Sequence, residues 1–206
     1  MGSKLLTTMV IWTILSFPSV VRANAEESPN GPLQQLRINV AGVLGALDNK
    51  KEKDKTVEER RLEARSIADR AFDFSLISRR TLGAHWDKLS PQDREDFTKK
   101  FTNLLAASYM GKIETYEGGQ IQYIGEKITG DTAVVKTQVA AKNPILLDYD
   151  MQKSGDAWRV YDISINGTKM VGNYHSQLDR IMRQKDGRGF GVIMKSLDEK
   201  EQKSGK

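Results

Sequence analysis

Residues 158–178, WRVYDISINGTKMVGNYHSQL, contain the pattern that decides the fold. In the first half, Tyr161, Ile163 and Ile165 alternate with polar residues, which is the two-residue period of a strand with one buried face. In the second half, apolar residues recur every three or four positions, which is typical of a helix with one apolar stripe. A strand therefore leads directly into a helix, and each has an apolar face that another part of the molecule must cover.

The junction between this strand and this helix has the residues of a turn and a cap. Gly167 follows Asn166 and adopts backbone angles that other residues resist, so the pair predicts a turn. The hydroxyl of Thr168 can then accept a hydrogen bond from an unpaired amide in the first helical turn. We expect Thr168 to be the N-cap of the helix.

The first 25 residues have the three parts of a secretory signal peptide. A short basic start precedes an uncharged, mostly apolar run over residues 5–21. Ala23 and Ala25 then supply the small residues of a cleavage site. The run is short and interrupted by Pro18, which disfavours a membrane anchor. We predict cleavage after Ala25 and export of the rest of the chain.

The composition limits the class of protein. The chain has 206 residues, no Cys, two His and a net charge of +5. Without Cys there is neither a disulfide bond nor a lipid attachment site, so a hydrophobic core must stabilise the fold. The positive charge is small and mixed with acidic residues, which argues against nucleic-acid binding. We predict a single exported domain over residues 26–200 and a polar tail over residues 201–206.

Four consecutive segments in the second half of the chain have the pattern of strands. Short turn-forming sequences separate them, which favours antiparallel neighbours. The first segment changes its apolar face near Gly125, which predicts a β-bulge. The expected strands are residues 120–128, 132–142, 145–151 and 158–165.

Helical patterns lie on both sides of these strands. Thr56 and Glu59 have the spacing of a capping box, and Ser90 before Pro91 is a second helix start. The helix after Pro91 carries a long apolar and aromatic stripe that ends before Gly118. We predict an α+β fold, in which a four-stranded twisted antiparallel sheet packs with helices from both ends of the chain.

Residues with catalytic or metal-binding chemistry are sparse. Neither His85 nor His175 has metal-ligand spacing to a second His or a carboxylate. The sequence contains no nucleophile elbow and no phosphate-binding loop. Asp162 and His175 could form an acid–base pair, but such residues far more often cap a turn or lie in a satisfied core. We therefore expect no enzyme activity, no cofactor and no metal.

Two adjacent arginines, Arg79 and Arg80, leave two interpretations open. A guanidinium can hold a phosphate at the mouth of a pocket. The favoured interpretation is an ion pair with Asp73 or Asp162 that fixes the neighbouring helical turns.

Two separated motifs carry a family resemblance. The first is FDFSLISRRTLGAHW at residues 72–86, followed by LSPQ at residues 89–92. The second is WRVYDISING at residues 158–167, followed by MVGNY at residues 170–174. Together they resemble the MlaC family, the periplasmic toluene-tolerance proteins of Mla phospholipid-transport systems. The resemblance extends over the whole chain after the predicted cleavage site.

The resemblance implies a soluble carrier. Members of the family hold acyl chains in a cavity between helices and a twisted antiparallel sheet. They shuttle phospholipid between an outer-membrane lipoprotein–porin complex and an inner-membrane ABC transporter with an MCE-domain ring. The implied partners are thus phospholipid, as cargo, and those two complexes, for a monomer that approaches membranes only transiently. The chain departs from the family pattern at Thr168, Lys169, Met170, His175 and Leu178.

The physics of lipid transfer predicts a tail-binding cavity. Exposing two acyl chains to water costs over roughly 20 kcal/mol, at about 0.8 kcal/mol per methylene, so a carrier must cover nearly all of both tails. The predicted lining residues are Tyr109, Ile113, Tyr116, Val135, Val139, Leu147, Tyr149, Ile163, Ile165, Val171 and Tyr174. The alternatives are a hopanoid carrier, a cavity-bearing enzyme of similar cone shape, and a structural adaptor with a closed core.

Overall fold

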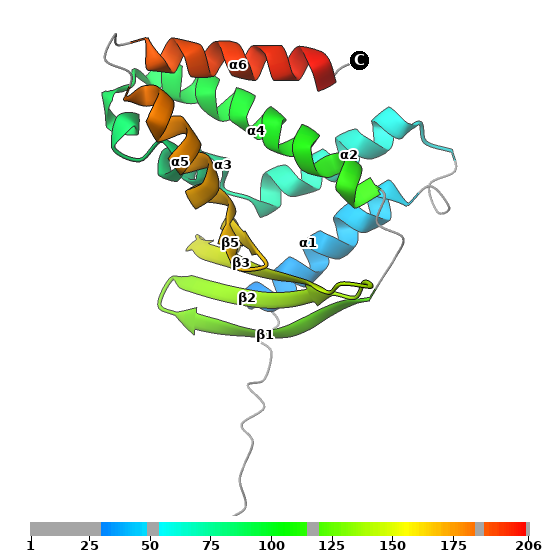
Figure 1. Ribbon diagram of the computed structural model, residues 1–206. Coiled ribbons are helices and arrows are strands. Elements are labelled where there is room, and N and C mark those ends of the chain that lie inside the picture. The colour runs from blue at the N-terminus through cyan, green and yellow to red at the C-terminus, as the bar shows by residue number, and fades with distance from the viewer. Residues whose placement is uncertain (1–29, 49–53, 115–119, 184–187, 205–206) are drawn as a thin grey trace, which may run out of the picture.

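Figure 1 shows the computed structural model of the protein, which describes residues 30–48, 54–114, 120–183 and 188–204. The predicted signal peptide and Tyr116 lie outside the described residues. The helices are α1 (Pro32–Leu47), α2 (Val57–Ala71), α3 (Phe74–Leu82), the 3-10 helix η1 (Gly83–Lys88), α4 (Pro91–Glu114), α5 (Met170–Met182) and α6 (Gly189–Ser204). The strands are β1 (Ile121–Thr129), β2 (Thr132–Val139), β3 (Ile145–Ser154), β4 (Ala157–Ile165) and β5 (Thr168–Lys169).

The predicted helix starts are confirmed. The Thr56 hydroxyl accepts a hydrogen bond from the backbone N–H of Glu59, and the Glu59 carboxylate accepts one from the backbone N–H of Thr56. This capping box begins α2. The Ser90 hydroxyl accepts a hydrogen bond from the backbone N–H of Asp93, and Pro91 is the first residue of α4. No helix among the described residues is both long and apolar enough to cross a bilayer.

The sheet is an antiparallel meander in the order β1-β2-β3-β4-β5. It has five strands, not the four that the sequence predicts, because the two residues of β5 pair with the end of β4. Thr168 is therefore part of a strand, and the prediction that it caps the next helix is wrong. The helix α5 begins after Lys169, whose side chain makes no capping hydrogen bond.

Two β-bulges interrupt the regular pairing of the sheet. The first lies beside Gly125 in β1, as the change of face in the sequence predicts. The second lies in β4, where Val160 and Asp162 pair with consecutive residues of β3 and Tyr161 is the extra residue. An extra residue moves all side chains beyond it to the opposite face relative to a regular strand.

The bulge in β4 corrects the predicted faces of this strand. Tyr161 packs with helices α3 to α6, whereas Ile163 packs on the side of the sheet that faces α1. Asp162 and Ser164, predicted to alternate with a buried apolar face, are themselves only 8% and 5% exposed. Tyr161 and Ile163 therefore do not share one apolar face, because the bulge separates them.

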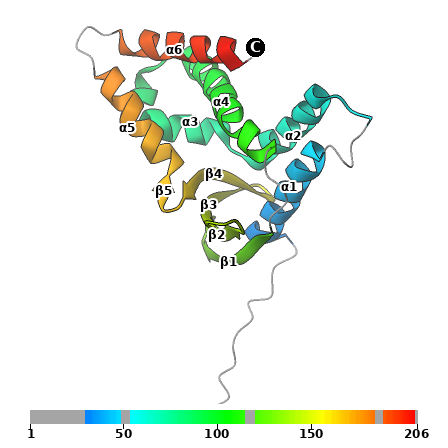
Figure 2. The same cartoon turned by 45° about the vertical axis from the view of Figure 1, so that its right-hand side comes forward.

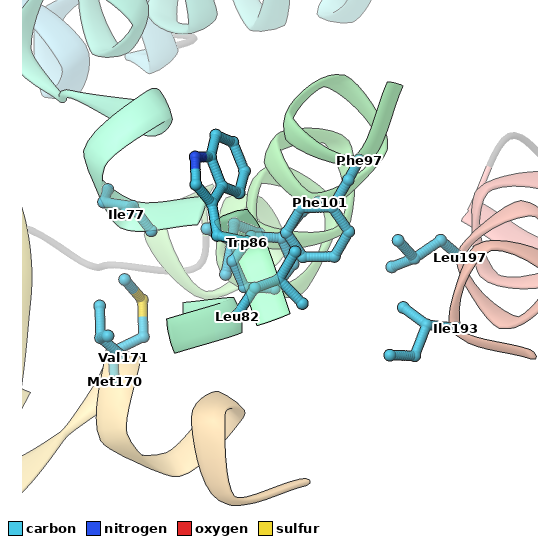
Figure 3. Close-up of a cluster of buried hydrophobic side chains, with 10 residues drawn as sticks. Ile77, Leu82, Trp86, Phe97, Phe101, Met170, Val171, Ile193 and Leu197 are labelled. Atoms are coloured by element: carbon cyan, nitrogen blue, oxygen red, sulfur yellow. The ribbon is translucent and has the colours of Figure 1, made fainter. Parts of the chain in front are cut away.

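The buried apolar residues form two clusters. The helical cluster joins α3 to α6, and its members include Ile77, Leu82, Phe97, Phe101, Leu105 and Ile193. Figure 3 shows Ile193 and Leu197 of α6 pointing toward the side of α4 that carries Phe97 and Phe101. The sheet cluster lies between α1 and the sheet, and its members include Leu33, Leu36, Val135, Met151, Trp158 and Val160. Phe72 packs against both clusters.

The two clusters belong to two layers that are visible in Figures 1 and 2. Helices α3 to α6 gather above the sheet, while α1 lies directly against it. Between the layers the chain crosses at Phe72, which forms an isolated parallel bridge with Val160 of β4. This crossing keeps the start of α3 beside the sheet.

Candidate functional site

A cavity of about 510 Å³ lies between the helical cluster and the sheet cluster. Its walls come from α1, α2, α3, α4, the start of α5 and strands β1 to β4. Nearly all of the lining side chains are aliphatic or aromatic. A volume of this size falls within the range of about 300–1,000 Å³ that is usual for ligand sites. The molecule therefore does not have the closed core that a structural adaptor would have.

The helix α1 forms one wall of the cavity. Leu36, Val40, Val43 and Leu44 recur at intervals of three and four residues, so they lie on one stripe of the helix. Leu36 is buried against the sheet at 3% exposure, while Val43 and Leu44 remain partly exposed. The stripe thus begins in the sheet cluster and continues into the wall of the cavity.

The helix α4 divides its apolar stripe between two tasks. In its first half, Phe97 and Phe101 stack with ring centroids 5.3 Å apart inside the helical cluster. In its second half, Tyr109, Met110 and Ile113 line the cavity. The length of the stripe, four to five turns, is what allows one helix to fill a core and also wall a cavity.

The sheet supplies the opposite wall through cross-strand neighbours. Leu147 of β3 pairs with Ile165 of β4, and Tyr149 pairs with Ile163. These four side chains line the cavity together with Val139 of β2. Directly opposite residues in an antiparallel pair lie on the same face, so the register of β3 and β4 builds a continuous apolar surface.

Seven of the predicted lining residues surround this cavity, and they are Tyr109, Ile113, Val139, Leu147, Tyr149, Ile163 and Ile165. Val135 does not, because it is completely buried in the sheet cluster. Val171 and Tyr174 also lie elsewhere, because α5 packs into the helical cluster, where the Tyr174 ring meets Phe101 edge-on at 5.2 Å. The role of the seven residues in binding lipid stays a prediction.

The sequence-based prediction omitted the walls made by α1 and α2. The apolar stripe of α1 is visible in the sequence, but the sequence alone does not say which surface it faces. In α2 the lining residues are small, with Ala64, Ala68 and Ala71 facing the cavity. Alanines of this kind carry little signal, since Ala favours a helix at any position and its single methyl group adds little to an apolar stripe.

The few polar side chains of the lining are mostly engaged. Arg65 donates hydrogen bonds to Asp69 Oδ1 at 2.8 Å and to Asn103 Oδ1 at 3.2 Å. Burial raises the pKa of Tyr149 to about 12, and burial also raises the pKa of Tyr109. Both tyrosines are therefore neutral at physiological pH, and the cavity favours an apolar occupant.

The acid–base pair that the sequence left open is not assembled. Asp162 Oδ1 accepts hydrogen bonds from the backbone N–H groups of Ile163 and Val171, at 2.8 and 3.0 Å. His175 Nδ1 donates to the carbonyl oxygen of Thr81 at 2.9 Å. Neither residue lines the cavity. Burial raises the pKa of the Asp162 carboxyl, while the two backbone N–H groups act in the opposite direction.

The arginine pair has contacts other than the favoured ones. Arg80 lies over the ring of Tyr161, with its guanidinium carbon 4.2 Å from the ring centroid. The Asp73 carboxylate accepts a hydrogen bond from the backbone N–H of Leu76 and so caps α3. Within the described ranges, neither arginine forms the predicted ion pair with Asp73 or Asp162. Arg79 instead borders a separate polar groove of about 330 Å³.

The remaining histidine also has a local partner. His85 Nε2 lies 2.9 Å from Asp179 Oδ1, which joins η1 to α5. In the part of the chain that the structure describes, no group of three or more His, Cys, Asp or Glu side chains could hold a metal ion.

Comparisons with known proteins place these features in a family. The family profile described as "MlaC protein" matches residues 38–199. A similar protein is the intermembrane phospholipid transport system binding protein MlaC of Haemophilus influenzae, 25% identical over 171 residues, which are 80% of this chain and 79% of that protein. A solved structure of similar fold is the phospholipid-binding protein of Ralstonia solanacearum in complex with a phospholipid, with a TM-score of 0.72 and 22% identity over 84% of this chain and 97% of that one. The two-layer α+β fold and the sequence match together show that the chain belongs to the MlaC family.

Proposed function

We propose that this protein is a periplasmic carrier that holds the acyl chains of a phospholipid in the 510 Å³ cavity. It transfers this lipid between the outer-membrane and inner-membrane components of an Mla-type transport system. The observation that carries the proposal is the cavity itself, which is large, lies between two layers and is walled almost wholly by apolar side chains. The names of the two relatives, a phospholipid transport binding protein and a phospholipid-binding protein, support the same cargo.

The energetics of lipid transfer agree with a cavity that is walled by apolar side chains. Each methylene that leaves a bilayer for an apolar cavity exchanges one oily environment for another, so the transfer itself is close to balanced. The barrier lies in the crossing through water, which a docked partner can shield. A carrier therefore needs extensive apolar cover and few polar contacts, which is the balance of side chains found around this cavity.

Export and partners belong to the same proposal. The first 25 residues have the pattern of a cleaved signal peptide, which delivers the chain to the compartment between the two membranes. There it exchanges lipid with an outer-membrane lipoprotein–porin complex and with an inner-membrane ABC transporter that bears an MCE-domain ring. Catalysis is not part of the proposal, because no nucleophile–base or acid–base pair is found among the described residues that line the cavity.

The direct test is to identify what the protein carries. The full chain is expressed with its own first 25 residues, purified from the periplasm and extracted with organic solvent, and the extract is analysed by mass spectrometry. We expect phospholipid in a fixed ratio to protein, and an unrelated periplasmic protein purified in parallel serves as the control. Folded protein without lipid would contradict the carrier function, and a hopanoid in place of phospholipid would change the cargo.

A further inference from the structure

We propose that Asn39 recognises the ester linkage of the bound lipid, at the point where an acyl chain joins the glycerol. This inference rests on the proposed carrier function and adds a specificity-determining residue to it. Asn39 lies in the middle of α1, and its side chain lines the cavity. It is one of very few polar residues that do so.

The surroundings of Asn39 on α1 are apolar. Leu36 and Val43, one turn before and one turn after it, line the same cavity. The neighbouring Gln35 shows how an amide on this helix is normally satisfied. Its side chain accepts a hydrogen bond from the backbone N–H of Trp158 at 2.6 Å and donates one to the carbonyl oxygen of Asp156 at 3.4 Å.

Asn39 differs from Arg65, the charged residue of the lining, in having its hydrogen-bonding groups uncommitted. The guanidinium of Arg65 binds Asp69 and Asn103. Among the residues that the structure describes, no group donates to or accepts from the carboxamide of Asn39. The carboxamide of Asn39, with two N–H donors and one carbonyl oxygen, is therefore available to an occupant of the cavity.

Asn at this position opposes the stability of the empty protein. Asn is a poorer helix former than Leu or Ala. In addition, burying an amide that has no hydrogen-bond partner among apolar side chains costs free energy. A residue that breaks two local rules without a compensating contact is expected at a functional site. The missing partner must then come from the occupant of the cavity.

The chemistry of a phospholipid identifies that partner. Acyl chains carry no hydrogen-bonding groups, but each ester linkage has a carbonyl oxygen that accepts from an N–H group. As the chains fill the cavity and exclude water, the amide and the ester carbonyl both need a partner, and each can satisfy the other. A lipid that consists of a hydrocarbon ring system without an ester has no carbonyl oxygen that could accept a hydrogen bond from Asn39. The residue therefore selects for glycerol esters.

The test compares a diester phosphatidylglycerol with its diether analogue, which has the same chains and headgroup but no carbonyl oxygens. Delipidated protein is incubated with vesicles that contain equal amounts of both lipids, and is then re-isolated for mass spectrometry. The wild type should retain the diester in roughly two- to tenfold excess, the range of one neutral hydrogen bond. Asn39→Leu and Asn39→Ala should lose this preference and still bind the diether. Both should also melt at a higher temperature than the wild type when empty, because Leu and Ala favour the helix.

The control is Gln34→Leu, which makes the same chemical change on α1 at a residue that does not line the cavity. It should keep the preference of the wild type. Equal retention of both lipids by the wild type and by both Asn39 variants would overturn the role of Asn39 and leave the carrier function intact. Failure of the wild type to retain either lipid would overturn the carrier function, and the inference with it. The Asn39→Ala variant distinguishes the loss of the amide from an effect of side-chain size, since Ala adds no atoms to the cavity.

Discussion

At the scale of single residues, Gly83 ends α3 in a conformation that other residues avoid. Its backbone angles are φ 55° and ψ −132°. A Cβ atom at this position would come within 2.9 Å of His175 Cε1. Nδ1 of the same ring donates a hydrogen bond to the carbonyl oxygen of Thr81 at 2.9 Å, which fixes the ring beside Gly83. At this point α3 and α5 meet, and there is space only for Gly.

We therefore expect Gly83→Ala to lower the free energy of unfolding by about 1–3 kcal/mol, through backbone strain and displacement of the His175 ring. Gly45→Ala is the matched control, because Gly45 lies in the last turn of α1 and a Cβ there meets nothing within 4 Å. It should stabilise the protein by about 0.5–1 kcal/mol. Urea denaturation of both variants measures the difference, and a change of the same sign in both would refute the argument.

Tyr149 links the cavity to a pH dependence of stability. Burial raises its pKa to about 12 in the folded protein, above the ordinary value of about 10. The unfolded chain therefore loses this proton first as the pH rises, and folding loses stability between about pH 10 and pH 12. Below about pH 10 the contribution of the Tyr149 hydroxyl to the stability of the folded protein is fully present.

Two pKa units correspond to about 2–3 kcal/mol, so the wild type should lose that much more stability than Tyr149→Phe between pH 9 and pH 12. Other residues titrate in the same range, and the comparison with Phe cancels them. Chemical denaturation of delipidated protein at each pH gives the two curves. Parallel curves would mean that the Tyr149 hydroxyl is not shielded from water.

At the scale of elements, the start of α5 depends on a residue from a strand. Asp162 of β4 accepts a hydrogen bond from the backbone N–H of Val171, in the first turn of the helix. Lys169, which precedes the helix, contributes no capping bond. Lys169 instead forms an ion pair with Asp150 of β3. The sheet and α5 are thus connected by side chains that emerge from the bulged region of β4 and its neighbour.

Asp162→Ala should destabilise the protein by about 1–3 kcal/mol, because it leaves the N–H of Val171 unpaired at a residue that is only 8% exposed. Asp162→Asn keeps an acceptor oxygen and should cost less. Hydrogen exchange at the Val171 amide is the specific measurement, and it should accelerate more in the Ala variant. Equal exchange in the wild type and both variants would show that the cap is unimportant.

At the scale of the whole molecule, the cavity exists because the protein has two hydrophobic cores instead of one. The helical cluster and the sheet cluster each pack within their own layer, and Phe72 is shared by both. Ile77, Leu105 and Met170 of the helical cluster face the cavity from one side, and Leu36 and Val160 of the sheet cluster face it from the other. The chain thus keeps its stability in two cores, and the space between them can hold a guest.

Filling that space should exclude the guest. Val139→Trp and Leu147→Trp place large side chains at the cavity wall and should reduce the co-purifying lipid at least about fivefold, since overpacking costs about 1–3 kcal/mol. Ile124→Trp is the matched control, because Ile124 is 60% exposed and does not line the cavity. Lipid-to-protein ratios by mass spectrometry provide the comparison. Unchanged lipid in both cavity variants would show that the cargo lies elsewhere.

The local elements of this protein follow from its sequence. The capping box at Thr56, the helix start at Ser90 and the bulge beside Gly125 depend on residues close together in the chain. Their physical signals, a side-chain oxygen near a free amide or a break in alternation, are local and therefore readable. The apolar faces of α4, β2 and β3 follow in the same way, which is why Tyr109, Ile113, Val139, Leu147 and Tyr149 could be named in advance as residues of one cavity wall or the other.

Only the tertiary structure decided how these faces are partnered. The bulge at Tyr161 depends on the register of β4 against β3, and it separates Tyr161 from the face that carries Ile163. The stripe of α5 packs into the helical cluster, so Val171 and Tyr174 do not reach the cavity, although their spacing is the same as that of residues that do. Hydrophobic burial has no direction, so a sequence determines that a face must be covered, and long-range packing determines what covers it.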